Sequence, residues 1–549
     1  MNAHFESSRQ TIVVIGHGMV GHRFCERLVE YDLDKKYRIV TFCEEPRAAY
    51  DRVGLTSFFA SRNAQKLMLA NLDWYRDQGI ELHVGDRATA IDRTQRVVTS
   101  DKGLKIKYEH VVLATGSYPF VPPMPGVDKL GVFLYRTIDD LERMIEHAKT
   151  CKRAAVIGGG LLGLEAAKAA YDLGLETHVI EFASRLMPRQ VDDPGSKLLV
   201  RKIEDLGVKV HLQKATKEIL GNGRVEKMVF TDGSELDVGM IIVSAGIRPR
   251  DELARQSGLQ VGERGGVSVN DQLTTSDPKI FAIGEVALHR TMVYGLVAPG
   301  YEMADIVASN LCGGSRQFSG ADLSTKLKLM GVDVASFGDY EAPPERARPL
   351  VYDDPFSGQY KKLLFSPDGT RLVGGVLVGD ASDYGTLLSL CKSGKPLPMP
   401  PGELIVGKKD GGATGLETLD DDSQICSCNN VTKGQICTAI SGQNLSTIGE
   451  LKTCTKAGTG CGGCIPLVTS LLNQQLTAAG KTVNRSLCEH FAYTRQELYQ
   501  IVKIKRLKNF DDLVRSHGKG HGCEICKPTV ASIFASLWNE NILDHATLQ

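Results

Sequence analysis

The sequence predicts an α/β fold in which two Rossmann-like dinucleotide-binding domains precede a small α+β module and a cysteine-rich end. Two glycine fingerprints predict the two domains, because each stands between a short apolar strand and a helix. Nine of the 14 cysteines lie between Cys426 and Cys526. Clustered cysteines in a cytosolic protein indicate metal ligands rather than disulfides.

The first fingerprint is Gly16-His17-Gly18-Met19-Val20-Gly21. It follows an apolar strand at 11–15 and opens a helix expected over about 22–30, and the next strand, 38–43, ends at Glu44-Glu45. The glycines let the backbone turn tightly and approach a pyrophosphate, and the acidic residue can bond a ribose hydroxyl. We therefore assign Gly16, Gly18, Gly21 and Glu44 to a dinucleotide.

The second fingerprint is Gly158-Gly159-Gly160-Leu161-Leu162-Gly163. It lies between the strand at 154–157 and a helix, and the following strand, 177–180, ends at Glu181. Gly158, Gly160, Gly163 and Glu181 are its candidate ligands. The negative charge of Glu181 would repel a 2′-phosphate and favours NADH over NADPH, although nearby Arg185 leaves that choice open.

Length and charge limit the classes of protein. A chain of 549 residues holds several domains, and its 65 basic and 65 acidic residues leave no excess charge for nucleic acid. No apolar run approaches the length of a membrane span, and the first residues lack a signal-peptide core. We expect a cytoplasmic protein without a membrane or nucleic-acid partner.

Four further segments resemble the FAD-dependent pyridine nucleotide–disulfide oxidoreductases. They are Tyr50-Asp51-Arg52, Val112-Leu113-Ala114-Thr115-Gly116-Ser117, Ser244-Ala245-Gly246-Ile247-Arg248-Pro249 and Thr275-Ser276-Asp277-Pro278-Lys279-Ile280-Phe281-Ala282-Ile283-Gly284-Glu285. The resemblance implies that FAD lies near Arg52, Ala114, Thr115, Gly116, Gly284 and Glu285, with the nicotinamide near Gly246. The family usually has Asp where this chain has Glu285.

The same resemblance implies a nested arrangement. An FAD domain (10–121 and 265–320) encloses an NAD(P)H domain (122–264), and an α+β module (322–395) and a linker (396–423) follow. The resemblance also places Glu165 near the nicotinamide as the candidate catalytic residue. A helix-dipole role explains Glu165 equally well, because a negative charge is favourable in the first turn of a helix.

Thiol–disulfide chemistry is not expected. The family's disulfide reductases carry a C-x4-C pair after the second strand, but no cysteine occurs between Cys43 and Cys151. We expect the isolated cysteines to be buried thiols. They are Cys25, Cys43, Cys151, Cys312 and Cys391. Electrons leaving the flavin therefore need another acceptor.

The cysteine-rich end contains Cys426, Cys428, Cys461 and Cys464 in a C-x-C…C-x-x-C pattern. Four thiolates in two pairs suit zinc or an iron–sulfur cluster. The spacing resembles the bacterioferritin-associated-ferredoxin-like (BFD-like) [2Fe–2S] domains, which implies a cluster in a domain at 424–485. Cys437 and Cys454 lie outside the pairs, and we interpret them as packing residues.

A shift of 62 residues repeats this pattern. It aligns Cys426, Cys461 and Cys464 with Cys488, Cys523 and Cys526, whereas Cys428 aligns with His490. The second repeat, 486–540, could hold a second cluster with one histidine ligand, hold zinc, or be a degenerate repeat without metal. His521 is a rival ligand.

The order of these parts resembles the large subunits of cytoplasmic NAD(P)H-dependent nitrite reductases. The resemblance implies that NADH reduces FAD, that FAD reduces the [2Fe–2S] cluster, and that nitrite is reduced to ammonium at a sirohaem–[4Fe–4S] centre. This chain has neither the C-x5-C nor the C-x3-C spacing of that centre. We therefore expect a sirohaem-containing half and a small subunit as partners, and a homodimer.

Other functions remain open from the sequence. An electron-transfer subunit of assimilatory nitrate reductase would share these parts. An NADH oxidase or a diaphorase like the ferredoxin reductases would use the same two dinucleotides. A non-enzymatic zinc-binding interaction protein would leave both dinucleotide sites unexplained.

Overall fold

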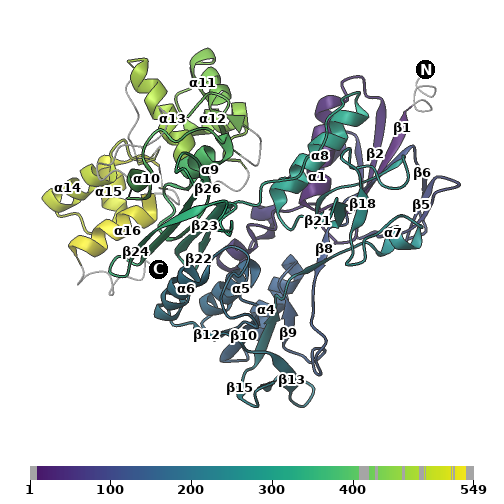
Figure 1. Cartoon of the computed structure of the whole chain (residues 1–549), viewed down its shortest axis with the longest axis horizontal. Coiled ribbons are helices and arrows are strands. Elements are labelled where there is room, and N and C mark those ends of the chain that lie inside the picture. The colour runs from purple at the N-terminus through teal and green to yellow at the C-terminus, as the bar shows by residue number, and fades with distance from the viewer. Residues whose placement is uncertain are drawn as a thin grey trace. The chain divides into compact units, whose positions relative to one another are not determined.

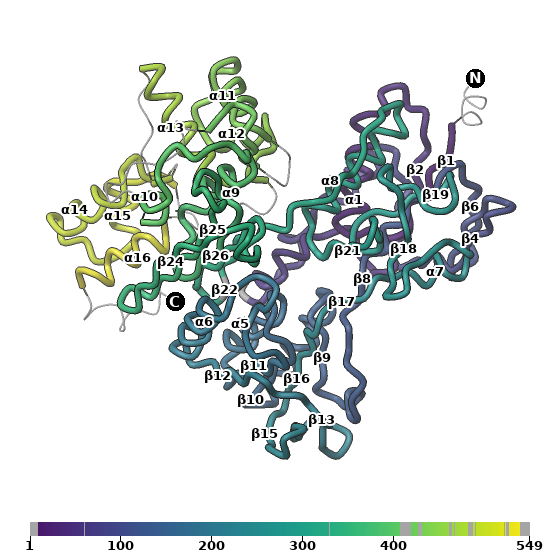
Figure 2. The backbone as a smooth tube through the Cα atoms, viewed as in Figure 1, coloured from purple at the N-terminus to yellow at the C-terminus, as the bar shows by residue number. Residues whose placement is uncertain are grey.

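The computed structural model describes residues 9–406, 419–426, 431–459, 464–480 and 487–538, except 489, 521 and 523–525. The chain divides into two compact units, which are described separately. The first comprises Met1–Ala439 and Gly449–Val468, and the second comprises Ile440–Ile448 and Thr469–Gln549. The elements are labelled in Figure 1, and Figure 2 traces the backbone.

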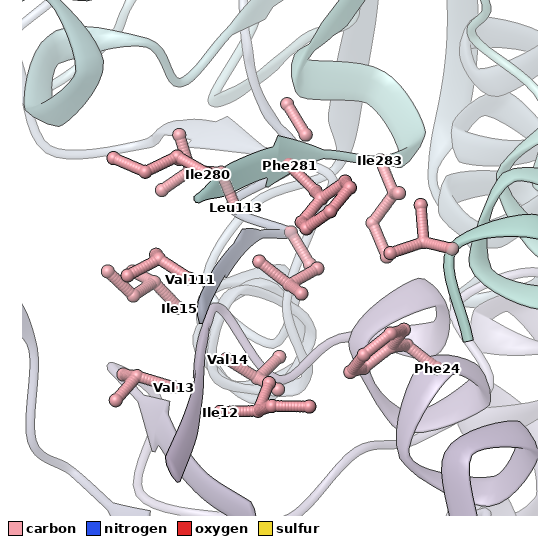
Figure 3. Packing of buried hydrophobic residues seen from close by; sticks show 14 of the residues in the cluster. Ile12, Val13, Val14, Ile15, Phe24, Val111, Leu113, Ile280, Phe281 and Ile283 are labelled. Atoms are coloured by element: carbon pink, nitrogen blue, oxygen red, sulfur yellow. The ribbon is translucent and has the colours of Figure 1, made fainter. Parts of the chain in front are cut away.

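The first fingerprint belongs to a five-stranded parallel sheet with the order β19-β7-β1-β2-β3. Its strands are β1 (Gln10–Ile15), β2 (Tyr37–Cys43), β3 (Ile80–Val84), β7 (His110–Leu113) and β19 (Ile280–Ala282). Helices α1 (Met19–Tyr31) and α8 (Val297–Leu311) pack side by side. The strands carry continuous apolar runs because both faces of a parallel sheet are buried, and Figure 3 shows their side chains meeting Phe24 of α1.

The second fingerprint belongs to another five-stranded parallel sheet with the order β12-β11-β10-β16-β9. Its strands are β9 (Val132–Leu134), β10 (Arg153–Ile157), β11 (Glu176–Ile180), β12 (Lys209–His211) and β16 (Met240–Val243). Its helices are α4 (Ile138–Ala148), α5 (Leu161–Asp172) and α6 (Asp193–Asp205). Strands β8 (Ser117–Pro119) and β17 (Ile247–Pro249), which pair antiparallel, carry the chain from the first sheet to the second and back.

Smaller elements complete these two α/β parts. They are η1 (Leu55–Ser57), α2 (Phe58–Ser61), η2 (Ala64–Leu67), α3 (Leu72–Asp77), β4 (Ala88–Asp92), β5 (Val97–Ser100), β6 (Lys105–Lys107), β13 (Thr216–Leu220), β14 (Lys227–Phe230), β15 (Glu235–Asp237), α7 (Glu252–Gln256), β18 (Val267–Val269), η3 (Gly284–Val286), β20 (Ala287–His289) and β21 (Met292–Val293).

A third, antiparallel sheet follows with the order β22-β23-β26-β25-β24. Its strands are β22 (Thr325–Leu329), β23 (Val332–Gly338), β24 (Arg348–Asp354), β25 (Gln359–Phe365) and β26 (Leu372–Gly379), and α9 (Tyr384–Ser393) follows them. Helix α10 (Pro401–Val406) lies inside the stretch predicted as linker, yet Leu404 and Ile405 pack into the core of this sheet. Two adjacent apolar side chains thus attach part of that stretch to the module.

The helices of the cysteine-rich end follow the 62-residue shift. After β27 (Gln424–Cys426) and β28 (Val431–Thr432) come α11 (Lys433–Gly442), α12 (Ile448–Thr455) and α13 (Ile465–Ala478). The later helices are α14 (Arg495–Lys505), α15 (Phe510–His517) and α16 (Cys526–Leu537). Their first residues lie 62, 62 and 61 positions after those of the earlier three.

The predicted α/β fold class is confirmed by the two parallel sheets, the antiparallel module and the helical end. The expectation that the isolated cysteines are buried is confirmed for Cys25 and Cys43, but Cys151 and Cys391 are only half-buried. The expectations for Cys312 and Cys454 are wrong. Both are exposed, because Cys312 caps the end of α8 and Cys454 lies near the end of α12. Among the described residues, no helix combines the length and apolar character needed to cross a membrane.

Candidate active site

The first fingerprint lines a cavity of about 820 Å³ at the carboxyl ends of β1, β2 and β7. Nine residues assigned to FAD from the sequence line this cavity. They are Gly16, Gly18, Glu44, Arg52, Ala114, Thr115, Gly116, Gly284 and Glu285. Ligands of open α/β sheets bind at this edge, so the cavity is the candidate FAD site.

The three fingerprint glycines have different surroundings. A Cβ atom on Gly16, whose φ is +96°, would lie 2.4 Å from the Ala114 carbonyl oxygen, and one on Gly21 would lie 2.3 Å from the Gly16 carbonyl oxygen. Gly21 therefore packs strand against helix and does not line the cavity. At Gly18 the nearest atom is 3.9 Å away, on Arg52, so this turn leaves the space that a pyrophosphate needs.

Glu285 is held by Ser117, which ends one of the segments quoted for the family, and by Arg136, which the sequence did not identify. It accepts hydrogen bonds from the Ser117 hydroxyl at 2.6 Å and from Arg136 at 2.7 Å. The longer side chain in place of the family's Asp thus reaches a cation on the cavity wall. Arg136 gave no sequence signal, because it stands 149 positions before Glu285.

Two arginines of the cavity, Arg250 and Arg52, are also paired. Arg250 donates to Glu44 at 2.5 Å. Arg52 forms an ion pair with Glu45 and donates to the Arg136 carbonyl oxygen at 2.9 Å. These contacts hold both arginines in the lining of the candidate FAD cavity.

His17, inside the fingerprint, is tied to a buried network. Hydrogen bonds join its ring to the Tyr75 hydroxyl at 2.9 Å and to the Thr41 hydroxyl at 3.1 Å, and Tyr75 also bonds His22 at 2.9 Å. Burial, together with the smaller effect of nearby His22, lowers the pKa of His17 to about 3. His17 is therefore neutral at physiological pH and holds the turn in place.

The second fingerprint repeats the geometry of the first. A Cβ atom on Gly158 would lie 2.2 Å from the Ser244 carbonyl oxygen, and one on Gly163 would lie 1.9 Å from the Gly158 carbonyl oxygen. A Cβ atom on Gly160 would meet no neighbouring atom of the described residues within 4 Å. Glu181 accepts hydrogen bonds from the Gly159 N–H at 2.6 Å and the Ala183 N–H at 2.7 Å. The acidic residue is thus fixed beside the turn.

Three further residues complete the nucleotide region. Arg185 pairs with Asp193 at 2.9 Å and Glu341 at 3.2 Å, so it is engaged away from Glu181. Gly246 has φ +106° and forms the turn between β16 and β17. Burial raises the pKa of Glu165 to about 7, and its carboxyl has no hydrogen-bond partner among the described residues.

The structure places part of each predicted metal site. Cys426 is buried in β27, and Cys464 directly precedes α13, whereas Cys428 and Cys461 lie outside the described residues. In the second repeat, Cys488, His490 and Cys526 lie together, whereas Cys523 and His521 lie outside the described residues.

Comparison with known proteins gives the family. The model of the pyridine nucleotide-disulphide oxidoreductases matches residues 10–304. The chain belongs to this family. The BFD-like [2Fe-2S] binding domain matches residues 424–474, and the rubredoxin NAD+ reductase C-terminal domain matches residues 324–395.

Relatives of this oxidoreductase match it over almost its whole length. It is 50% identical to the nitrite reductase [NAD(P)H] large subunit of Klebsiella oxytoca over 98% of this chain and 57% of that protein. It is also 50% identical to the nitrite reductase (NADH) large subunit of Escherichia coli over 99% of this chain and 65% of that protein. The chain therefore spans less than two thirds of the length of both relatives.

A solved structure matches the oxidoreductase part. A ferredoxin reductase from Rhodopseudomonas palustris superimposes with a TM-score of 0.66 at 27% identity, covering 72% of this chain and 97% of that chain. The chain is thus an NAD(P)H-dependent flavoprotein oxidoreductase whose cofactors are FAD, NADH and a [2Fe–2S] cluster. The open space at Gly18 and Gly160 fits the two dinucleotides.

Proposed function

We propose that the chain is the electron-input module of an NADH-dependent nitrite reductase. It oxidises NADH at the flavin and passes electrons to the cluster of the first repeat, for reduction of nitrite to ammonium at a sirohaem centre outside this chain. The observation that carries the proposal is the presence of two dinucleotide turns and a [2Fe–2S] domain in one chain. Nitrite is proposed as the acceptor because both relatives are nitrite reductases.

The residues of the first cavity would bind FAD. Gly16 and Gly18 would bring backbone N–H groups to the pyrophosphate, and Glu44 would bond the adenosine ribose. Glu285, held by Ser117 and Arg136, would accept a hydrogen bond from the ribityl chain. When bound, FAD supplies hydride acceptance from NADH and release of single electrons.

The residues of the second fingerprint would bind and select the coenzyme. Gly158 and Gly160 would admit the NADH pyrophosphate, and Gly246 would line the nicotinamide side. Glu181 would bond the ribose and repel a 2′-phosphate, and Arg185 would not compensate because Asp193 and Glu341 hold it. Glu165, whose pKa of about 7 leaves it partly protonated at neutral pH, would lie at the nicotinamide.

The cluster would be bound by Cys426, Cys428, Cys461 and Cys464. A Cys426→Ser variant should still show bleaching of the flavin absorbance by NADH, but it should lose iron and the electron resonance signal of the reduced cluster. Cys454→Ala, which removes an exposed thiol of the same repeat, should keep both. A purified chain without FAD, or with a flavin that NADH does not bleach, contradicts the proposal.

We also propose a cytoplasmic homodimer that docks a sirohaem-containing reductase and a small subunit. Both relatives are large subunits of nitrite reductases, which supports a further subunit as a partner. Light scattering of the purified chain should give twice the monomer mass, and a monomer would contradict the homodimer.

A further inference from the structure

Three potential metal ligands meet in the second repeat. Cys488, His490 and Cys526 each offer one ligand atom, and these atoms all lie within 4.8 Å of one another. The Cys488 sulfur and the His490 Nδ1 atom are 3.8 Å apart. The family match to a [2Fe-2S] domain ends at residue 474, so it does not cover these three ligands.

A tight turn brings the first two ligands together. The Phe491 N–H donates to the Cys488 carbonyl oxygen at 3.2 Å, and the Leu487 N–H donates to the Tyr493 carbonyl oxygen at 2.7 Å. Cys526 begins α16, and its buried side chain shares one hydrophobic core with Phe491. The ligands are therefore fixed by local hydrogen bonds and by packing, not by an extended surface loop.

Two glycines let the backbone pass close to the ligands. A Cβ atom on Gly522, whose φ is +77°, would lie 3.3 Å from the Cys526 sulfur and 2.5 Å from the Phe510 ring. A Cβ atom on Gly520, whose φ is +66°, would lie 3.2 Å from the His490 ring. Glycine is required here because any side chain would enter the space beside the sulfur or the imidazole.

The mutual distances identify the kind of site. Ligand atoms of tetrahedral zinc lie about 3.5–3.8 Å apart, given zinc–sulfur and zinc–nitrogen bonds of about 2.3 and 2.0 Å. In a [2Fe–2S] cluster each iron takes two protein ligands, so any three ligands are divided between two irons by the width of the cluster. Three atoms that all lie within 4.8 Å of one another instead converge on one centre.

We propose that the second repeat binds a single tetrahedral zinc ion through Cys488, His490 and Cys526. These three ligands occupy three of the four positions of a tetrahedral site and leave one position for a further ligand. Zinc has no redox chemistry, so this repeat stabilises α14, α15 and α16 and takes no part in electron transfer. The zinc site therefore has a structural role, whereas the cluster of the first repeat transfers electrons. This difference does not depend on which terminal acceptor the protein uses.

Metal and sulfide analysis of the purified full chain tests the proposal. We expect one zinc, two irons and two acid-labile sulfides per flavin. Cys488→Ala, His490→Ala and Cys526→Ala should each lower zinc at least about fivefold, and iron and flavin bleaching by NADH should not change. His490→Cys should retain zinc, because a thiolate suits zinc as well as an imidazole does. The controls His517→Gln and Cys454→Ala should retain the zinc, both irons and both sulfides.

A second readout covers variants that fold poorly. The Trp538 indole donates to the Leu507 carbonyl oxygen at 3.0 Å and packs against the core that contains Cys526. Removing zinc from the full chain with a chelator should therefore change its tryptophan emission, and adding zinc should restore it. His490→Cys should show the same response.

Two results would overturn the proposal. Four irons and four sulfides per flavin without zinc would show a second cluster. Absence of any metal from the second repeat after growth and purification with added zinc would show a degenerate repeat. Because neither result alters NADH oxidation at the flavin, both can be distinguished from failure of the proposed function.

Discussion

The Glu165 carboxyl is buried, and no neighbouring group that the structure describes offsets the cost of burying its charge. Burial raises its pKa to about 7 from an ordinary value of 4.5. Above pH 4.5 the unfolded chain releases this proton while the folded chain retains it, so folding becomes less favourable up to about pH 7. A residue that costs stability in this way is typical of a functional site.

Replacing Glu165 with Gln should therefore stabilise the protein in a pH-dependent way. We expect a gain of about 2–3 kcal/mol in the free energy of unfolding at pH 8 and almost none at pH 4.5. Chemical denaturation at both values measures it, with exposed Glu142→Gln on α4 as the control. An equal gain at both values would show that the carboxyl does not titrate as described.

Glu181 is the second residue whose charge has a measurable consequence. Glu181→Gln keeps the size of the side chain but removes the negative charge, so the preference for NADH over NADPH should fall about tenfold or more, equivalent to about 1.4 kcal/mol. The ratio of kcat/KM for the two coenzymes measures it. Exposed Glu204→Gln on α6 should leave that ratio unchanged, and an unchanged ratio in Glu181→Gln would exclude this role.

At the scale of elements, the strand–turn–helix unit depends on two different uses of glycine. Gly163 is packed against the Gly158 carbonyl oxygen, whereas Gly160 faces open space. One position serves folding and the other leaves room for a ligand. The two roles can be separated by the same substitution.

Gly163→Ala should lower stability by about 1–3 kcal/mol, because the added methyl group overpacks the turn. Gly160→Ala should leave the melting temperature nearly unchanged but raise the Kd for NADH, because its methyl group would enter the pyrophosphate space. Thermal unfolding and NADH titration compare the two variants. Equal effects of both substitutions on stability would contradict the distinction.

The sequence predicted those elements whose residues act locally. Each fingerprint turn, its flanking strand and its acidic partner follow from a spacing of a few tens of residues. Contacts such as Arg136 with Glu285 join distant segments and leave no local pattern. Helix α10 was missed because Pro401 and Gly402 read as linker, and only packing against the third sheet makes Leu404 and Ile405 interior residues.

At the scale of the whole molecule, the chain contains the parts for accepting electrons from NADH. The sequence lacks the cysteine spacings of a sirohaem–[4Fe–4S] centre. Input and nitrite reduction are therefore expected to be separable activities.

The purified chain should reduce an artificial acceptor with NADH but leave nitrite unchanged. Parallel assays of dye reduction and nitrite loss measure the two activities. Adding a sirohaem-containing reductase half should restore nitrite loss. Turnover of nitrite by this chain alone would contradict the proposed division.

The shared spacing of the six helices in the cysteine-rich end has an evolutionary consequence. Helix starts that keep an offset of 62, 62 and 61 residues indicate one ancestral unit duplicated head to tail. After such a duplication only one copy must preserve the ancestral cofactor, and selection on the other copy is relaxed. The aligned ligands differ at one position, Cys428 in one copy and His490 in the other, and there the second copy could exchange a cluster ligand for a zinc ligand.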